Sequence, residues 1–214
     1  MTTPTTASRP RLGVLISGGG RTLLNLADRI DDGSLPAVIA TVIASRHGLA
    51  GTERAEARGL PVTVVARADH ADPAAVHDHI DALLDEAAVD LVCLAGYLRL
   101  FRVDPPYRGR VLNIHPALLP AFGGKGMFGQ HVHEAVIAAR RPFSGCTVHV
   151  VDEHYDHGPI VLQRACPVRP DDTASTLADR VFAEECIAYP EAIRLFAAGR
   201  LRIDDRRVTI LPPA

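Results

Sequence analysis

The chain has 214 residues, of which 47% are hydrophobic and 22% are charged, proportions typical of a folded globular protein. The 23 Lys and Arg residues nearly balance the 25 Asp and Glu residues, and the formal net charge is −2. A charge so close to zero argues against binding to nucleic acid or to an acidic membrane surface. Aromatic residues make up only 5% and Trp is absent, so we expect a core of Val, Ile, Leu and Ala.

The N-terminal segment 1–10 is rich in Thr and Pro, and we expect a disordered tail there, followed by a single domain over 11–214. No apolar stretch approaches the roughly 18–20 residues of a membrane span. The four cysteines are widely spaced and form no CxxC pair, which argues against a disulfide framework. Together these features predict a cytoplasmic protein.

Seven short apolar runs predict β-strands, which are in chain order Leu12–Ser17, Val38–Ala44, Val62–Val65, Leu91–Ala95, Val111–His115, Thr147–Val151 and Ile160–Cys166. The first five are continuously apolar and rich in β-branched residues, as parallel strands buried on both faces are. The last two are joined by a turn at His157-Gly158-Pro159, and we expect them to be antiparallel.

Helical patterns fill the intervals, over about 22–32, 50–58, 73–88, 130–140 and 173–198. The third has a clear start, with Asp72 as N-cap and Pro73 in the first turn. Alternating strands and helices indicate right-handed crossovers. The sequence therefore predicts an α/β fold, a Rossmann-like, mostly parallel sheet flanked by helices, with antiparallel strands added toward the C-terminal half.

A glycine-rich loop follows the first predicted strand and runs into a helix, with the sequence Ser17-Gly18-Gly19-Gly20-Arg21-Thr22. Three consecutive glycines let the backbone approach an anion, and the N–H groups of a helix N-terminus attract one. Arg21 would add a charge-assisted contact. The dinucleotide fingerprint fails at Leu23, and no Walker lysine follows. The loop favours a phosphate site without a dinucleotide; the alternative is a tight turn that binds nothing.

Two polar residues, Asn113 and His115, lie at the end of the fifth predicted strand, before Pro116. Strand alternation places them on the same face, roughly 6.5–7 Å apart. An amide and an imidazole at the carboxyl end of a parallel strand can hold a developing oxyanion and move a proton. The alternative is a hydrogen-bonded strand end without catalytic function.

The loop that contains Asp156 is dense in acidic and histidine residues. A carboxylate near His115 would raise the pKa of that histidine and keep it protonated. The chain has ten histidines, but His131 and His133 are two residues apart on a predicted helix and face apart, so no metal site is expected. We interpret His149 as a satisfied interior histidine.

Glu185 falls inside the apolar arc of the last predicted helix, which includes Leu177, Val181 and Ala188. A carboxylate there needs a partner. The amine of a ligand and a structural salt bridge to an arginine both fit this need.

These motifs occur in the order found in the phosphoribosylglycinamide formyltransferase family of purine biosynthesis, which the chain resembles over about residues 11–200. The segments that carry the resemblance are L-I-S-G-G-G at 15–20, L-A-G-Y-L-R at 94–99, N-I-H-P-A-L-L-P at 113–120, G-C-T-V-H at 145–149 and D-H-G-P-I-V-L-Q at 156–163. The N-I-H-P-x-L-L-P and D-x-G-P blocks, so spaced, are specific to the folate-dependent formyltransferase superfamily.

The resemblance implies a catalytic role for three residues in transfer from the co-substrate 10-formyltetrahydrofolate to glycinamide ribonucleotide. Asn113 and His115 would hold and protonate the formyl oxygen. Asp156 would keep His115 protonated and help remove the proton from the attacking amine. No metal is implied, the partners are these two small molecules, and we expect a monomer or a homodimer.

The resemblance also implies two binding regions. The ribonucleotide would contact Gly20, Arg21, Thr22, Phe182, Ala183, Glu184 and Glu185, and Glu185 would thereby receive an amine partner. The folate would contact Asn113 together with Leu98, Arg99, Leu100, Phe101, Asp152, Glu153, His154 and Tyr155.

The chain departs from the family pattern at three places. The family's phosphate loop commonly reads G-N-G-S-N, whereas Gly19, Arg21 and Thr22 replace its Asn, Ser and last Asn. The segment 122–129 is longer and richer in glycine, which indicates a mobile flap over the nucleotide with Lys125 as an extra phosphate contact. Cys186 stands where a His is common.

Three other functions compete with this interpretation. A formyltetrahydrofolate hydrolase would share the catalytic residues and use water as acceptor, but it usually carries an N-terminal regulatory domain. Methionyl-tRNA formyltransferase usually has a C-terminal RNA-binding domain. A non-catalytic module that binds a phosphate ligand would not need Asn113, His115 and Asp156 together.

Overall fold

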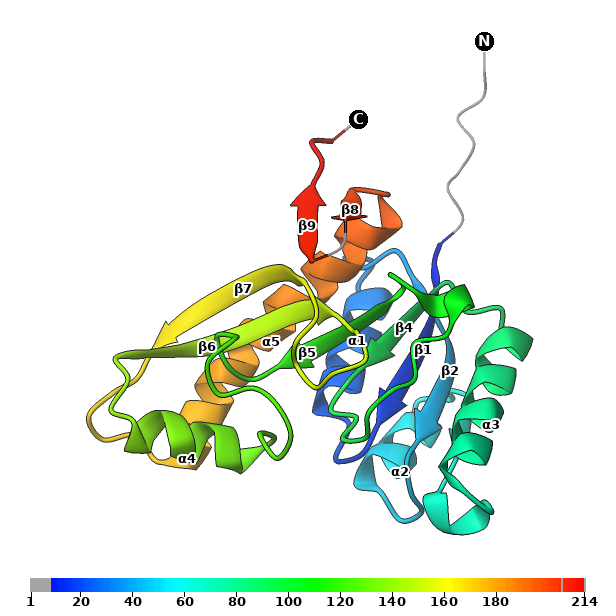
Figure 1. Cartoon of the computed structure of the whole chain (residues 1–214), viewed down its shortest axis with the longest axis horizontal. Coiled ribbons are helices and arrows are strands. Elements are labelled where there is room, and N and C mark those ends of the chain that lie inside the picture. The colour runs from blue at the N-terminus through cyan, green and yellow to red at the C-terminus, as the bar shows by residue number, and fades with distance from the viewer. Residues whose placement is uncertain (1–8, 205, 214) are drawn as a thin grey trace.

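The computed structural model describes residues 9–204 and 206–213, and in this part of the chain seven strands form one sheet in the order β3-β2-β1-β4-β5-β6-β7 (Figure 1). The strands are β1 (Arg11–Ile16), β2 (Val38–Ala44), β3 (Val62–Val64), β4 (Leu91–Leu94), β5 (Val111–His115), β6 (Phe143–Val150) and β7 (Ile160–Pro167). The first five are parallel, and β6 and β7 add to β5 antiparallel. The predicted fold class is confirmed.

The predicted helices form with bounds that differ from the expected ones by at most two residues. They are α1 (Arg21–Asp31), α2 (Ala50–Glu56), α3 (Pro73–Glu86), α4 (Gln130–Ala138) and α5 (Ala174–Ala197), with short 3-10 turns at Arg67–Asp69 and Pro105–Tyr107. The Asp72 side chain accepts a hydrogen bond from the Ala75 N–H at 2.9 Å, which confirms it as the N-cap of α3.

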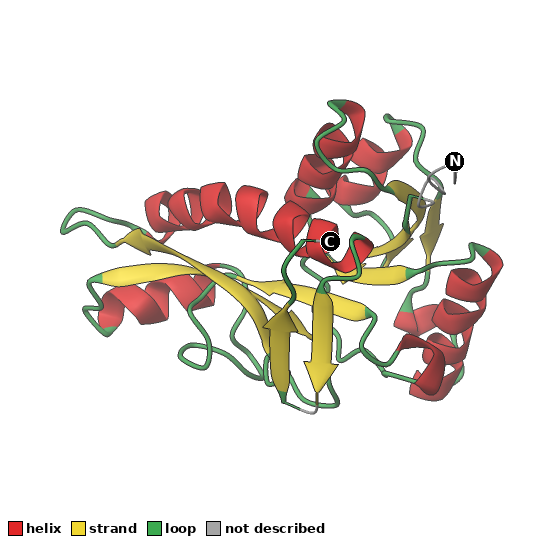
Figure 2. Ribbon diagram, turned by 90° about the horizontal axis from the view of Figure 1, so that it is seen from above, coloured by secondary structure: helices red, strands yellow, loops and turns green. Residues whose placement is uncertain are grey.

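Helices cover both faces of the sheet because side chains alternate along each strand. Val14 of β1 belongs to the larger core cluster, which includes buried residues of α1, α2, α4 and α5. Its neighbour Leu15 points the other way, into a second cluster with Ile80 and Leu84 of α3. The long helix α5 runs along the sheet (Figure 2).

Tyr189 anchors α5 beneath the centre of the sheet. Its side chain is fully buried, and its hydroxyl donates to the Leu112 carbonyl at 2.9 Å, with the Leu94 carbonyl at 3.2 Å. These carbonyls belong to β5 and β4, so the bond places the α5 residues that precede Tyr189 near the carboxyl ends of those strands.

A hairpin of β8 (Leu201–Asp204) and β9 (Arg207–Ile210), not expected from the sequence, forms a separate two-stranded sheet. Its residues are exposed or only partly buried, and charged side chains stand among the apolar ones. Strands so short and polar lack the apolar pattern by which a strand is predicted from sequence. In the structure, Ile203 and Val208 of the hairpin pack against the larger core cluster.

The predicted disordered tail lies outside the described residues except for Arg9 and Pro10. The Pro10 carbonyl accepts a hydrogen bond from the Val38 N–H at 3.0 Å, so the pairing of β1 with β2 extends back to this residue. Within residues 9–204 and 206–213, none of the helices combines the length and the apolar character needed to cross a bilayer.

Candidate active site

A cavity of about 720 Å³ opens at the carboxyl ends of β1, β4 and β5. Ligands of open α/β sheets bind at this edge, outside the ends of the parallel strands. The cavity is lined by residues of the segments 18–22, 95–98, 113–116, 124–130 and 155–156 and of α5. The glycine loop, the Asn113–His115 strand end, Asp156 and Glu185 therefore share one cavity.

Within the glycine loop, position 20 requires glycine because of both conformation and packing. Gly20 has φ of 73°, in the left-handed region, and a Cβ there would lie 3.0 Å from the Cα of Gly51. Gly20 is the N-cap of α1 and has no side chain to cap the helix. The first N–H groups of α1 are thus left for an anion, as the phosphate interpretation requires.

Arg21 links the start of α1 to α5 beside this loop. Its guanidinium carbon lies 4.0 Å from the centre of the Phe182 ring, a cation–π contact, and its Nη2 is 3.0 Å from Oδ1 of Asp179. Both charged side chains of this ion pair are more than half exposed. The guanidinium is therefore oriented at the cavity wall while it stays accessible to a ligand.

Asn113, His115 and Asp156 meet at the wall of the cavity. Asn113 and His115 extend from β5, and Asp156 lies in the loop between β6 and β7 with φ of 53°, unusual for a residue with a side chain. The Nδ1 atom of His115 is 3.4 Å from Oδ2 of Asp156. The Nδ2 atom of Asn113 donates to Oδ1 of Asp156 at 3.3 Å.

The segment after β5 holds the other sides of His115 and Asp156. The Nε2 atom of His115 donates to the carbonyl oxygen of Phe122 at 2.8 Å, and the Gly124 N–H donates to Oδ2 of Asp156 at 2.9 Å. A carbonyl oxygen only accepts, so Nε2 carries a hydrogen. The Nδ1 atom, which faces Asp156, is therefore the nitrogen that can gain or lose a proton.

Asp156 acts on the pKa of His115 in the expected direction, but the expectation that it keeps His115 protonated is wrong for the chain without ligand. Burial lowers the pKa of His115 below its ordinary value, and the attraction of Asp156 and the bond to Phe122 offset this only in part. His115 is 3% exposed, so its cation would lose most of its hydration. Burial alone would raise the pKa of Asp156, but the nearby side chains of His149 and His115 and the hydrogen bond from the Gly124 N–H hold it below its usual range.

His149 is buried, as expected of an interior histidine, but it also touches the site. It lies opposite Asn113 in the β5–β6 ladder. Its Nδ1 lies 3.0 Å from the Val150 carbonyl, so Nε2 accepts from the Asn113 amide at 3.0 Å. His149 thereby orients Asn113, and this contact depends on the antiparallel register that places the two residues opposite each other.

Glu185 faces the cavity from α5 and forms no ion pair within the described part of the chain, so the salt-bridge alternative is not realised. Burial raises the pKa of Glu185 to about 7, although the charge of Arg21 acts in the opposite direction. A carboxyl group with this pKa is ready to ionise against a ligand amine.

Several residues expected to bind ligands do not line the cavity, in contrast to Leu98 and Tyr155, which do. Those outside it are Arg99, Leu100, Phe101, Asp152, Glu153, His154, Ala183 and Glu184. Phe101 is buried in the second core cluster, the Arg99 guanidinium donates to the Val65 carbonyl at 3.4 Å, and Glu184 pairs with Arg164 at 2.7 Å.

His133 is a cavity residue that the sequence analysis did not select. It lines the cavity from α4 and is 4% exposed, whereas His131 faces outward, as the spacing predicts. Its Nδ1 has no hydrogen-bond partner among the described residues. Lys125, expected as a phosphate contact, also lines the cavity, and its role stays a prediction.

A family model described as formyl transferase matches residues 10–193 of the chain. The chain is 40% identical over 199 residues to a protein of Vigna unguiculata named phosphoribosylglycinamide formyltransferase, chloroplastic. This alignment covers 92% of the chain, and the chain spans 64% of the length of that relative.

Solved structures are similar over nearly the whole chain. Glycinamide ribonucleotide transformylase 1 from Symbiobacterium toebii has a TM-score of 0.90 and 41% identity, with 99% of each chain covered. A formyltetrahydrofolate deformylase from Pseudomonas syringae has a TM-score of 0.84 at 22% identity, with 96% of this chain and 67% of that chain covered. At this identity the second likeness concerns the fold alone.

Proposed function

Because this chain belongs to the formyl transferase family, we propose that it transfers a formyl group from 10-formyltetrahydrofolate to the amine of glycinamide ribonucleotide. One observation carries the proposal: a polar triad of Asn113, His115 and Asp156 shares a single cavity with the glycine loop and Glu185. A phosphate, an amine and a formyl carbonyl are the three groups for which such a cavity has complementary chemistry.

The phosphate end of the ribonucleotide would lie at the glycine loop. The free N–H groups at the start of α1 and the partial positive charge of that helix end attract a phosphate. Arg21 would exchange its contact with Asp179 for the phosphate while it stays stacked on Phe182. This arrangement supplies a side-chain contact at the position where the phosphate loop departs from the family pattern.

The amine end would lie between Glu185 and the triad. Attack requires a neutral amine, and a carboxyl with a pKa of about 7 can accept a hydrogen bond from the amine without holding it permanently as a cation. The formyl group of the folate would then face the amine near Asn113 and His115.

In the transfer, a C–N bond forms between the amine and the formyl carbon, and the bond between that carbon and the folate nitrogen breaks. The amine loses one proton and the folate nitrogen gains one. Nδ1 of His115, unprotonated because burial lowers the pKa, takes up the proton. The imidazolium beside Asp156 would then stabilise the oxyanion together with an N–H of Asn113 that gives up its 3.3 Å contact with Asp156, and His115 would act as general acid toward the leaving nitrogen.

The folate would approach past Leu98 and Tyr155, which line the same cavity.

The four cysteines are free, as is usual in a reducing compartment, and three of them are buried. We propose that the reaction takes place in the cytoplasm, which the free cysteines fit. No step in it requires a metal.

Hydrolysis of 10-formyltetrahydrofolate is the second candidate, because the triad of Asn113, His115 and Asp156 could equally serve a water molecule as acceptor. Water as acceptor would need the triad but neither the glycine loop nor Glu185. The two functions are distinguished by measuring release of tetrahydrofolate from 10-formyltetrahydrofolate with and without glycinamide ribonucleotide. We expect turnover only with the ribonucleotide and formation of the formylated product; turnover that ignores the ribonucleotide would favour the hydrolase.

A further inference from the structure

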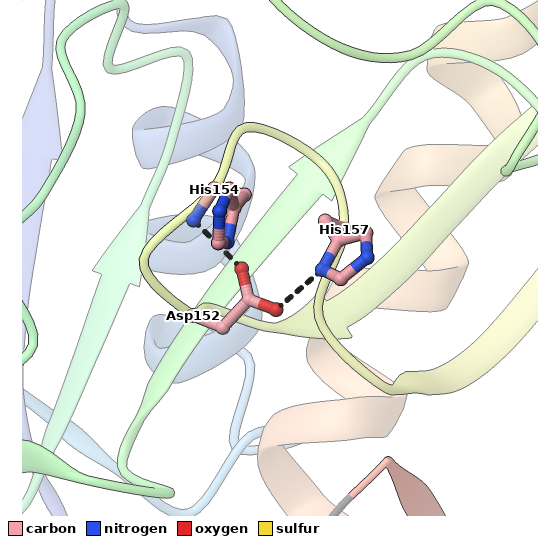
Figure 3. Close-up of side chains that lie close together, drawn as sticks. All are labelled: Asp152, His154 and His157. Carbon is pink, nitrogen blue, oxygen red and sulfur yellow. Dashed lines mark hydrogen bonds and ion pairs between the residues drawn. The ribbon is translucent and has the colours of Figure 1, made fainter.

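Three metal-ligating side chains gather in the loop between β6 and β7, outside the cavity. Asp152, His154 and His157 each offer one ligand atom, and these three atoms lie within 4.8 Å of one another (Figure 3). Their spacing is Asp-x-His-x-x-His, and the two histidines flank the cavity residues Tyr155 and Asp156. The proposed formyl transfer uses none of these three side chains.

Internal contacts already orient the carboxylate of this cluster. Oδ1 of Asp152 accepts from the backbone N–H of His154 at 2.9 Å, and Oδ2 lies 2.9 Å from Nδ1 of His157. The rings of His154 and His157 are 5.3 Å apart, edge to face. Both histidines are exposed, so small rotations of their rings are unhindered by the core.

The donor set defines the class of ion. Two imidazoles and one carboxylate suit a divalent transition metal such as Zn²⁺, whereas Mg²⁺ and Ca²⁺ prefer oxygen ligands. Zinc bonds of about 2.1 Å place tetrahedral ligands about 3.4 Å apart. Oδ2 of Asp152 and Nδ1 of His157 are already closer than this, and the His154 ligand atom, within 4.8 Å of both, would have to move inward only by a small ring rotation.

A cation of the chain competes for the same histidine. Nη1 of Arg206, from the turn of the β8–β9 hairpin, lies 2.9 Å from Nε2 and 3.1 Å from Nδ1 of His157. Its Nη2 donates to the His157 carbonyl at 3.3 Å. A metal ion would displace this exposed guanidinium by charge repulsion, so Arg206 lowers the affinity of the cluster for a cation.

We propose that Asp152, His154 and His157 bind one divalent transition-metal ion of the Zn²⁺ class. The ion bridges the two ends of the segment 154–157 and thereby restrains the loop that carries Asp156. Water completes the coordination, because the chain supplies three ligands and the cluster is exposed.

The test is titration of the full chain, without affinity tag and stripped of metal by a chelator, with Zn²⁺ alone in competition with a chromophoric zinc indicator. We expect one ion per chain at this site. The variants Asp152→Asn, His154→Gln and His157→Gln each weaken binding by at least about tenfold, since even changes to residues that only support ligands cost this much. The variant Arg206→Ala strengthens binding.

His131→Gln is the matched control, because His131 is also an exposed histidine with a carboxylate neighbour, Glu134, at 3.6 Å. This variant should bind Zn²⁺ as the wild type does. Thermal unfolding in chelator checks that all variants fold alike. Undiminished binding by His154→Gln and His157→Gln would place the ion elsewhere and overturn the proposal, as would the absence of binding to the wild type.

Discussion

The carbonyl oxygen of Phe122 accepts a hydrogen bond from Nε2 of His115 at 2.8 Å. In the proposed transfer this bond would select the reacting nitrogen of the histidine, because it occupies Nε2 and leaves Nδ1 facing Asp156 at 3.4 Å. The segment after β5 would then influence the proposed chemistry through the tautomer of His115. In the same segment, the Gly124 N–H orients Asp156.

Replacing His115 by Ala should lower kcat of formyl transfer by about 10²–10⁴-fold, the range typical of a lost general acid–base group. The KM for the ribonucleotide should change little, because the phosphate and amine contacts remain. Steady-state kinetics over both substrates measure this, and the same variant at His131, an exposed residue of α4, is the control. A kcat close to the wild-type value would contradict the proton-transfer role.

Replacing Arg21 by Ala should raise the KM for glycinamide ribonucleotide by about tenfold, as expected for a lost charge-assisted hydrogen bond of about 1.5 kcal/mol. The value of kcat should stay similar, since phosphate binding is the same in ground and transition states. Arg29→Ala is the matched control: this arginine is partly exposed on α1 and pairs with Asp32 away from the cavity.

Replacing Asp179 should have the opposite effect on the KM for the ribonucleotide, because its carboxylate pairs with Arg21 in the absence of phosphate. The variant Asp179→Asn is expected to lower the KM for the ribonucleotide or leave it unchanged. If Arg21→Ala has no effect on KM, the phosphate lies elsewhere in the cavity.

Glu185 should make the unliganded chain less stable as the pH rises. Its pKa in the folded state is about 7, above the ordinary value near 4.5, because burial disfavours the charged form. The contribution of Glu185 to the free energy of unfolding is therefore fully present below about pH 4.5 and is lost as the pH rises through about 7. Urea unfolding at several pH values should show a smaller loss over this range in Glu185→Gln; parallel curves for the two proteins would contradict the raised pKa.

His133 should contribute to ligand binding more than to stability. Its Nδ1 is buried without a partner among the described residues, which costs free energy in the folded chain. We expect His133→Leu to leave the free energy of unfolding unchanged or to raise it, while the KM for the ribonucleotide rises. Equilibrium unfolding and kinetics measure the two effects, and a strongly destabilised variant with a normal KM would show a structural role instead.

The sequence by itself determined the elements of the fold, because their signals are local. Apolar β-branched runs predicted the sheet strands, and the pair Asp72 and Pro73 predicted the start of α3. The sequence does not predict the β8–β9 hairpin, because its strands are only four residues long, contain charged side chains and have no buried residue. The sequence also predicts the glycine loop and the pair Asn113 and His115, because each lies within a short stretch of the chain.

Only the tertiary structure decided how these residues act on one another. The antiparallel register brings His149 against Asn113, and the turn after β5 brings Phe122 onto His115, contacts that no spacing along the chain predicts. Burial is also a property of the whole fold: it lowers the pKa of His115 in spite of Asp156 and raises that of Glu185. The kinds of chemical groups in the site follow from the sequence, whereas their protonation follows from how deeply the packed chain removes them from water.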